Sequence, residues 1–122
     1  FNRIPCYVKV AREAPALFKY DGAYYLITSG CTGWGANPAA YAICKGESPL
    51  DAWTDMGNPC VSDTSICKYG ANLTFGSQST NVLAVNPEKG EYIYMGDRWN
   101  NSSPAGNELI DPKYIEHIFL LF

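Results

Sequence analysis

Two polar residues occupy matching positions in a repeated pattern of this sequence, and both side chains could take part in chemistry. Glu13 stands four residues before Leu17, and Gln78 stands four residues before Val82, each at the start of an apolar run. A carboxyl group can deliver or accept a proton, whereas a neutral amide is a poor proton acceptor that binds hydroxyl groups or water. On the residues alone, the simpler interpretation of Glu13 is a surface carboxylate paired with Arg12.

The elements that would carry these two residues are β-hairpins. Apolar and aromatic residues run over 15–20 and 23–28 on either side of Asp21-Gly22, a dipeptide typical of the primed turns between antiparallel strands. A second hairpin is predicted over 81–95 with its turn at 86–90, and further strands are predicted at 41–44, 53–56 and 114–122. No window of about ten residues has a helical period, so the sequence predicts an all-β fold.

The two hairpins repeat after about 65 to 68 residues, a length that suits one four-stranded blade of a β-propeller. Since the innermost strand of each blade starts at the central funnel, the repeat predicts that Glu13 and Gln78 face one cavity from neighbouring blades. The alternative is that antiparallel hairpins merely resemble one another. Two blades cannot close a ring, so residues 1–122 are expected to be a fragment of a larger domain, or to be completed by another chain.

Composition excludes several classes of protein and of site. The chain has 122 residues, 47% of them hydrophobic and 17% charged, with a formal net charge of −3, which excludes a disordered chain. No basic run is present, so neither nucleic acid nor a membrane is an expected partner. The five cysteines are widely spaced and His117 is the single histidine, so we expect no metal site and no cofactor.

The cysteines and the glycosylation motifs favour a secreted protein. Cys60 and Cys67 bracket a short polar segment, and we predict a disulfide bridge between them. Sequons begin at Asn72, Asn100 and Asn101. Together these features predict an extracellular location.

Several motifs resemble glycoside hydrolase family 43, whose enzymes are five-bladed β-propellers, and within it the exo-β-1,3-galactanases. The similar segments are 12–15, 18–26, 29–34, 57–60, 78–80 and 95–99. The resemblance implies that this chain corresponds to the middle and later blades of such an enzyme. Its substrate would then be a galactan-type polysaccharide, and further blades would come from the same chain or another one.

The resemblance also implies roles for the two repeated residues. The family inverts anomeric configuration, with an acid and a base roughly 6.5 to 9.5 Å apart so that a water fits between them. Glu13 matches the general acid, and Gln78 matches a base proposed to act through its imidic-acid tautomer. The alternative for Gln78 is binding of a sugar hydroxyl or of the water. The aspartate that serves as base in most of the family lies on a first blade that this chain does not contain.

Four further residues are candidates for sugar binding. Asp97 and Arg98 could hold sugar hydroxyls through charge-assisted hydrogen bonds, and Trp34 and Trp99 could stack on the apolar face of a galactose ring. Residues 100–113 form an insert where the resemblance implies a short loop. Two other functions stay open beside a β-1,3-galactan hydrolase: a secreted carbohydrate-binding or structural propeller segment without activity, and an extracellular protein-interaction propeller.

Overall fold

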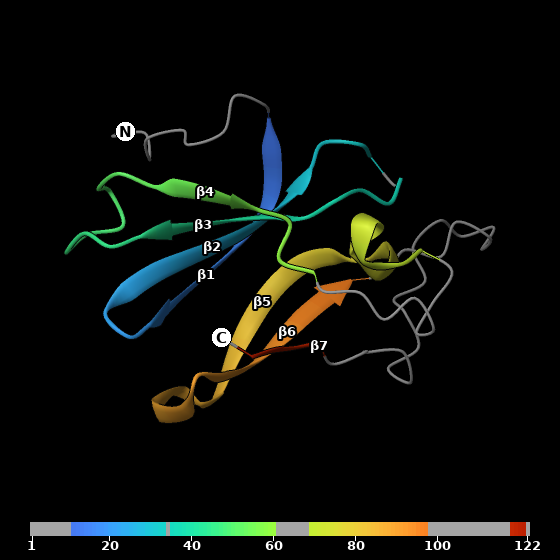
Figure 1. Ribbon diagram of the computed structural model, residues 1–122. Coiled ribbons are helices and arrows are strands. Elements are labelled where there is room, and N and C mark those ends of the chain that lie inside the picture. The colour runs from blue at the N-terminus through green and yellow to red at the C-terminus, as the bar shows by residue number, and fades with distance from the viewer. Residues whose placement is uncertain (1–10, 34, 61–68, 98–117, 122) are drawn as a thin grey trace.

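The protein is described by a computed structural model, which covers residues 11–33, 35–60, 69–97 and 118–121. These residues form two antiparallel sheets (Figure 1). The first sheet has the order β1 (Arg12–Tyr20), β2 (Ala23–Gly30), β3 (Ala40–Cys44) and β4 (Thr54–Gly57). The second has the order β5 (Gln78–Asn86), β6 (Glu91–Asp97) and β7 (Ile118–Leu121), and two short 3₁₀ segments are η1 (Ala71–Gly76) and η2 (Pro87–Lys89). The prediction of an all-β chain is confirmed.

Both predicted hairpins are present, and their turns follow from the residues that form them. Asp21 and Gly22 have φ values of 45° and 77°, the two positive values that a type I′ turn requires, and Tyr20 pairs with Ala23 across it. The second hairpin turns through η2 and closes on Gly90, whose φ of 73° lies in the left-handed region. The predicted later strands also form, as β3, β4 and β7.

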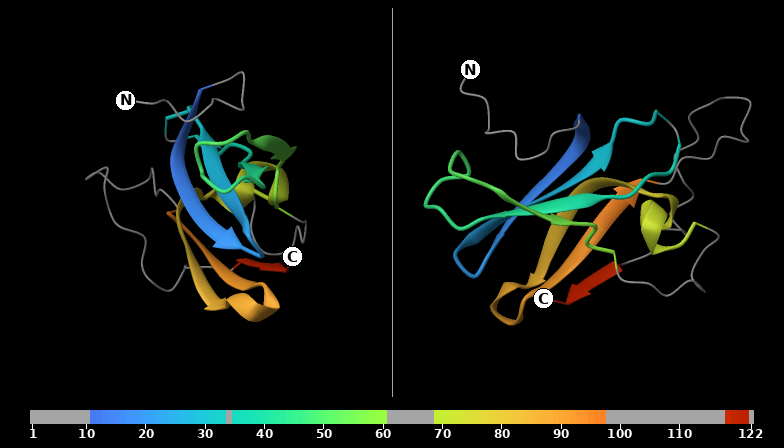
Figure 2. Two further views of the ribbon diagram at one scale, coloured as in Figure 1. Left: turned by 90° about the vertical axis from the view of Figure 1, so that its left-hand side faces the viewer. Right: turned by 45° about the horizontal axis from the view of Figure 1, so that its top comes forward.

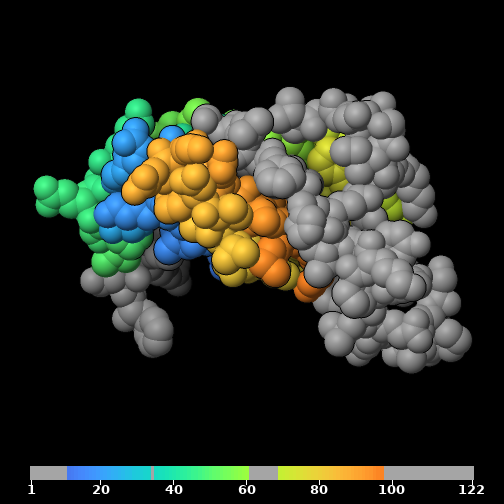
Figure 3. All heavy atoms as spheres, turned by 90° about the horizontal axis from the view of Figure 1, so that it is seen from below, coloured from blue at the N-terminus to red at the C-terminus, as the bar shows by residue number. Residues whose placement is uncertain are grey.

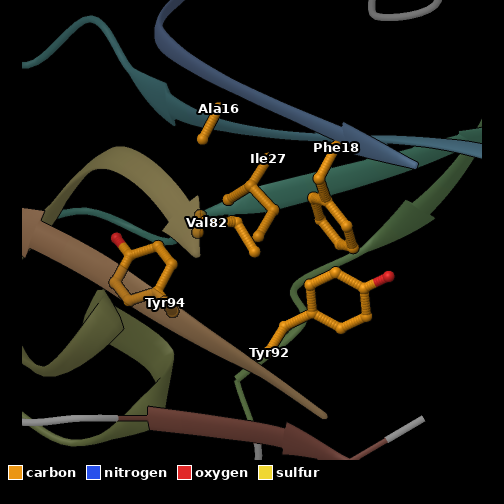
Figure 4. Packing of buried hydrophobic residues seen from close by; sticks show 7 residues of the cluster. Ala16, Phe18, Ile27, Val82, Tyr92 and Tyr94 are labelled. Atoms are coloured by element: carbon orange, nitrogen blue, oxygen red, sulfur yellow. The ribbon is translucent and has the colours of Figure 1, made fainter. Parts of the chain in front are cut away.

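The core lies between the two sheets, which pack face to face (Figure 2). Figure 4 shows side chains of the first sheet pointing toward Val82, Tyr92 and Tyr94 of the second. Phe18 stacks on Tyr25 and packs against Tyr92, with both pairs of ring centroids 5.1 Å apart. The buried members of this cluster are Ala16, Phe18, Ile27, Ala39, Val82, Tyr92 and Tyr94. Because the two hairpins share this core, the starts of β1 and β5 have fixed relative positions.

The outer faces of the same strands keep apolar side chains in contact with solvent. In β1, Leu17 is 50% exposed although its neighbours Ala16 and Phe18 are buried. In β5, Leu83 and Val85 are 50% and 54% exposed. The surface of β5 and β6, yellow and orange in Figure 3, lies beside that of the first hairpin, in blue.

The predicted bridge between Cys60 and Cys67 is wrong for this structure, because Cys60 is a free thiol. Cys60 is partly buried, its backbone amide donates to Asn58 Oδ1 at 2.9 Å, and burial raises the pKa of its thiol to about 11. Position 67 lies outside the described residues. The short spacing of the two cysteines was therefore not a sufficient signal for a bridge.

Candidate active site

Glu13 and Gln78 meet in the structure, as the sequence repeat predicts. The amide nitrogen Nε2 of Gln78 donates a 2.9 Å hydrogen bond to the carboxylate oxygen Oε1 of Glu13, across 65 positions of sequence. Both side chains are partly buried. Since Gln78 is the first residue of β5 and Glu13 the second of β1, the contact joins corresponding ends of the leading strands of the two sheets.

The simpler interpretation of Glu13 paired it with Arg12, but the Arg12 side chain binds groups of β2 and of the segment after it. Its guanidinium donates to Thr28 Oγ1 at 3.1 Å, to the Thr28 carbonyl at 2.9 Å and to the Pro38 carbonyl at 3.2 Å. These three bonds tie the start of β1 to the end of β2 and to the segment that follows it. The charge of Arg12 thereby supports the backbone beside Glu13, while the carboxylate of Glu13 is engaged by Gln78.

The loop after β2 is built around the side chain of Asn37. Its Oδ1 accepts hydrogen bonds from the Gly30 amide at 2.8 Å and from Ser29 Oγ at 3.2 Å, and its Nδ2 donates to Thr32 Oγ1 at 2.7 Å. Ser29 is also the register partner of Glu13 in the β1–β2 pair. Asn37 therefore fixes the described part of the loop that borders Glu13.

A single hydroxyl group connects that loop to the segment that leads into β5. Thr74, in η1, is 2% exposed; its Oγ1 accepts from the Ala39 amide at 2.6 Å and donates to the Asn37 carbonyl at 2.8 Å. The Thr74 carbonyl in turn accepts from the Ser77 amide and from Ser77 Oγ, one residue before Gln78. The approach to Gln78 is thus anchored on the first sheet.

Of the four predicted sugar-binding residues, the structure places Asp97. It is the last residue of β6, it is exposed, and it is the register partner of Gln78, so it lies at the same end of the second sheet. Trp34, Arg98 and Trp99 lie outside the described residues, as do the insert at 100–113, His117 and the sequons at Asn100 and Asn101.

Metal and membrane features are absent from the part of the chain that the structure describes. No cluster of three or more His, Cys, Asp or Glu side chains there could hold a metal ion. Neither of the short helical segments within 11–33, 35–60, 69–97 and 118–121 has the length and apolar character of a membrane span.

Sequence reasoning missed three residues that shape this site. The sequence pattern did not predict hydrogen bonds from the hydroxyl groups of Ser79 and Thr74, although Thr74 is part of the Asn72 sequon. Tyr94 belongs to the core between the two sheets, is 5% exposed, and its hydroxyl makes no hydrogen bond of normal geometry within the described residues, although Ser77 lies near it. The only available signal was their position next to the repeated apolar run, which does not distinguish a hydroxyl that binds backbone from one that faces solvent.

The contact between Glu13 and Gln78 differs from the spacing that the resemblance implied. An inverting acid and base stand roughly 6.5 to 9.5 Å apart, whereas here an amide nitrogen and a carboxylate oxygen are 2.9 Å apart. In this arrangement Gln78 orients the carboxylate, and one oxygen of Glu13 is occupied.

Comparison with known proteins relates these features to one group of enzymes. A scan against models of protein families found no match, and neither did a search of curated proteins. Among solved structures, a family 43 β-1,3-galactosidase with galactodeoxynojirimycin is 39% identical, with a TM-score of 0.64, over 88% of this chain and 30% of that one. An exo-β-1,3-galactanase from Clostridium thermocellum is 40% identical, with a TM-score of 0.53, over 82% of this chain and 19% of that one.

A third solved structure contains a bound substrate. A variant of the exo-β-1,3-galactanase from Phanerochaete chrysosporium with β-1,3-galactotriose is 27% identical, with a TM-score of 0.54, over 73% of this chain and 18% of that one. Our chain therefore spans less than a third of the length of each of these relatives, with 30% as the largest share. Sequence and structure agree that this chain belongs to glycoside hydrolase family 43, as a partial chain of the galactanase-like kind.

Proposed function

We propose that this chain is the segment of an exo-β-1,3-galactanase that carries the general acid, and that Glu13 is that acid. The observation that carries the proposal is the 2.9 Å hydrogen bond between Gln78 and Glu13, which brings the two repeated residues together at matching strand ends. The similarity to β-1,3-galactosidases and exo-β-1,3-galactanases supports the choice of a β-1,3-linked galactan as substrate.

The geometry gives the two oxygens of Glu13 different tasks. Because Gln78 Nε2 donates to Oε1, that oxygen is the acceptor, and the proton of the acid form belongs on Oε2. Transfer of this proton to the glycosidic oxygen would let the galactosyl bond break without expelling an alkoxide. Partial burial of Glu13 limits the access of bulk water to the proton.

Inversion of configuration requires Gln78 to leave this contact. A galactosyl ring and a water must lie between acid and base, and the present hydrogen bond leaves no room for them. We therefore propose that the sugar separates the pair on binding, after which the Gln78 amide holds the attacking water. Asp97, at the same end of β6, would accept hydrogen bonds from sugar hydroxyls. Arg98, Trp34 and Trp99 stay predicted sugar contacts.

The surfaces of the two sheets support a larger, propeller-shaped enzyme. Leu17, Leu83 and Val85 are each at least half exposed on the outer faces of the sheets, and in a propeller both faces of an inner blade are covered. We propose that residues 1–122 form about two of five blades, and that the other blades come from the same polypeptide or another one. On the evidence of its sequons we further propose that the protein is secreted and glycosylated, for example at the exposed Asn72.

The decisive experiment compares two substrates in the natural full-length protein. Glu13→Gln should lower kcat on β-1,3-galactobiose by about a hundredfold to ten-thousandfold, because general acid catalysis is lost. A 2,4-dinitrophenyl β-galactoside has a leaving group that needs no proton, so its hydrolysis should change little. Glu88→Gln is the matched control, since Glu88 is exposed in the η2 turn at the far end of the β5–β6 hairpin. Equal losses on both substrates, or no loss, would refute the acid role.

The stereochemistry and the chain length complete the test. Proton NMR of the first product should show α-galactose, the outcome of inversion; β-galactose would mean that the mechanism is retaining. The isolated 122-residue chain should show no turnover, because its 30% share of the related galactosidase leaves most of a substrate site unbuilt.

A second candidate is a carbohydrate-binding segment without activity. Catalysis by inversion requires Glu13 and Gln78 to separate, whereas binding of a sugar beside the pair in contact does not. Galactose binding by the natural full-length protein, with no hydrolysis of either substrate, would select this function over the first.

A further inference from the structure

Glu13 reaches Gln78 only because β1 contains a β-bulge. The β1–β2 pairing shifts between Glu13 and Ala16: Ala16 pairs with Ile27, whereas Glu13 pairs with Ser29. Two residues of β1, Ala14 and Pro15, therefore oppose the single residue Thr28. Since side chains alternate along a strand, one extra residue moves everything before it to the other face.

The bulge changes the face of the sheet on which the Glu13 side chain lies. In an unbulged strand Glu13 would share a face with Leu17, which is exposed on the outside of the sheet. With the bulge it shares the face of Ala16 and Ile27, which are buried against the second sheet. The same shift sends Arg12 to the outer face, where it binds Thr28. The bulge thus decides which of the two side chains faces β5.

The backbone of the bulge is held in a conformation that alanine does not favour. Ala14 has a φ of 51°, in the region that favours glycine, and bulges of this kind usually place glycine there. Something must hold the strand in this shape. The structure offers the hydroxyl of Ser79, which donates a short hydrogen bond to the Ala14 carbonyl.

Ser79 is suited to that task by its own surroundings. Its side chain is 3% exposed, and it belongs to β5, immediately after Gln78. Two hydrogen bonds therefore cross between the sheets side by side, from Gln78 to the Glu13 side chain and from Ser79 to the next backbone carbonyl. The first engages the reacting group, and the second fixes the backbone that carries it.

We propose that Ser79 is a positioning residue for Glu13: by holding the Ala14 bulge it keeps the carboxyl on the face that receives the sugar. The inference rests on the proposed role of Glu13 as the acid. It assigns Ser79 no contact with substrate. Ala14→Gly should reduce the need for Ser79, because glycine adopts a positive φ without the cost that alanine incurs.

The test uses three variants of the natural full-length protein. Ser79→Ala should lower kcat on β-1,3-galactobiose by about tenfold to a hundredfold with little change in KM, because the acid is displaced rather than removed. Hydrolysis of 2,4-dinitrophenyl β-galactoside should be preserved, whereas general unfolding would lower both activities. Thr80→Ala is the matched control, since the exposed Thr80 hydroxyl bonds only within the second sheet, to the Met95 carbonyl. Ala14→Gly combined with Ser79→Ala should recover most of the lost activity.

A second measurement separates this inference from the proposed function. In ¹H–¹⁵N NMR spectra the Gln78 side-chain amide should have a distinct position that Glu13→Gln abolishes, because that variant removes the charged acceptor. Ser79→Ala should move this signal in the same direction, and Ala14→Gly should reverse the move. If the wild type hydrolyses no galactan but these shifts occur, the proposed function fails and the positioning role stands. An unchanged Gln78 signal in Ser79→Ala, or equal loss on both substrates, overturns the positioning role.

Discussion

The hydroxyl oxygen of Thr74 accepts a 2.6 Å hydrogen bond from the backbone amide of Ala39, which lies 35 positions earlier in the chain. Both residues are buried, and the same hydroxyl donates to the Asn37 carbonyl at 2.8 Å. One side chain therefore satisfies a donor and an acceptor of the loop that follows β2. The Thr74 side chain therefore links η1, which leads into β5, to the loop after β2, at the end where Glu13 and Gln78 meet.

Replacing this hydroxyl tests how much its two hydrogen bonds contribute to the stability of the protein. Thr74→Val keeps the shape but leaves the buried Ala39 amide without its acceptor, so the free energy of unfolding should fall by about 2 kcal/mol. Urea denaturation measures the change. Thr80→Val is the control: Thr80 is exposed, and its substitution should alter stability by less than about 0.5 kcal/mol. Equal effects of the two substitutions would contradict the role given to Thr74.

The contact between Gln78 and Glu13 predicts a pH-dependent effect of a new charge. Gln78→Glu places a second carboxylate 2.9 Å from the first, if the side chains keep their positions. Two ionised carboxylates in contact repel, whereas at low pH one of them holds a proton and the pair can share a hydrogen bond. The variant should therefore be clearly less stable than the wild type at pH 7, with a smaller difference near pH 4. Thermal unfolding at both pH values measures this.

The uncharged variant Gln78→Leu is the control for that experiment. It removes the same hydrogen bond without adding charge, so its loss of stability should change much less between pH 4 and pH 7 than that of Gln78→Glu. A destabilisation by Gln78→Glu that does not depend on pH would show that the two side chains are not in contact in solution.

The sequence predicted the parts of the fold that depend on local rules. Asp21-Gly22 demands positive φ values and forms the turn between β1 and β2, and runs of apolar and aromatic residues located the strands on either side. The repeat also placed Glu13 and Gln78 at matching strand ends, and the hydrogen bond between them agrees with this, while the shared sugar cavity stays a prediction. The turn and its strands need only a few adjacent residues to be recognised, whereas the repeat needs a comparison of the two hairpins.

What the sequence could not predict depends on contacts between distant residues. Ala14 carries no sign of its positive φ, since alanine rarely adopts one, and the Ser79 hydroxyl that donates to its carbonyl lies 65 positions away. Thr74 could be read as part of a glycosylation motif, but its hydroxyl is used by backbone groups of the first sheet. A pattern along the chain does not encode these partners.

The free thiol of Cys60 gives a prediction about reactivity. Burial raises its pKa to about 11, against the weaker opposing effect of a hydrogen bond with Thr74, so little reactive thiolate forms at pH 8. Iodoacetamide should label the exposed Cys31 first at pH 8, and labelling of Cys60 should rise steeply toward pH 11. Peptide mapping by mass spectrometry distinguishes the sites. A disulfide-linked peptide containing Cys60 would contradict the free thiol at this position.

Tyr94 should be a site where removing a polar group stabilises the protein. Its ring is buried among the core side chains, and its hydroxyl makes no hydrogen bond of normal geometry within the described residues, although Ser77 lies near enough to lower its pKa against the larger effect of burial (Figure 4). Because an unsatisfied buried hydroxyl costs free energy, Tyr94→Phe should raise the free energy of unfolding by about 1 kcal/mol at pH 7. Tyr24→Phe is the control, since the Tyr24 hydroxyl donates to the Glu47 carbonyl at 3.3 Å in an exposed position.

The same substitution has a distinct signature at high pH. Burial raises the pKa of Tyr94 from 10.0 to about 12, so the folded protein holds the phenolic proton more tightly than the unfolded chain does. Titration of Tyr94 should therefore leave the free energy of unfolding of the wild type unchanged below pH 10 and lower it as the pH rises from 10 to 12. Tyr94→Phe has no such proton, so its advantage over the wild type should grow across that interval in urea denaturation series. A constant difference between the two proteins from pH 7 to 12 would mean that the Tyr94 hydroxyl is as accessible in the folded protein as in the unfolded chain.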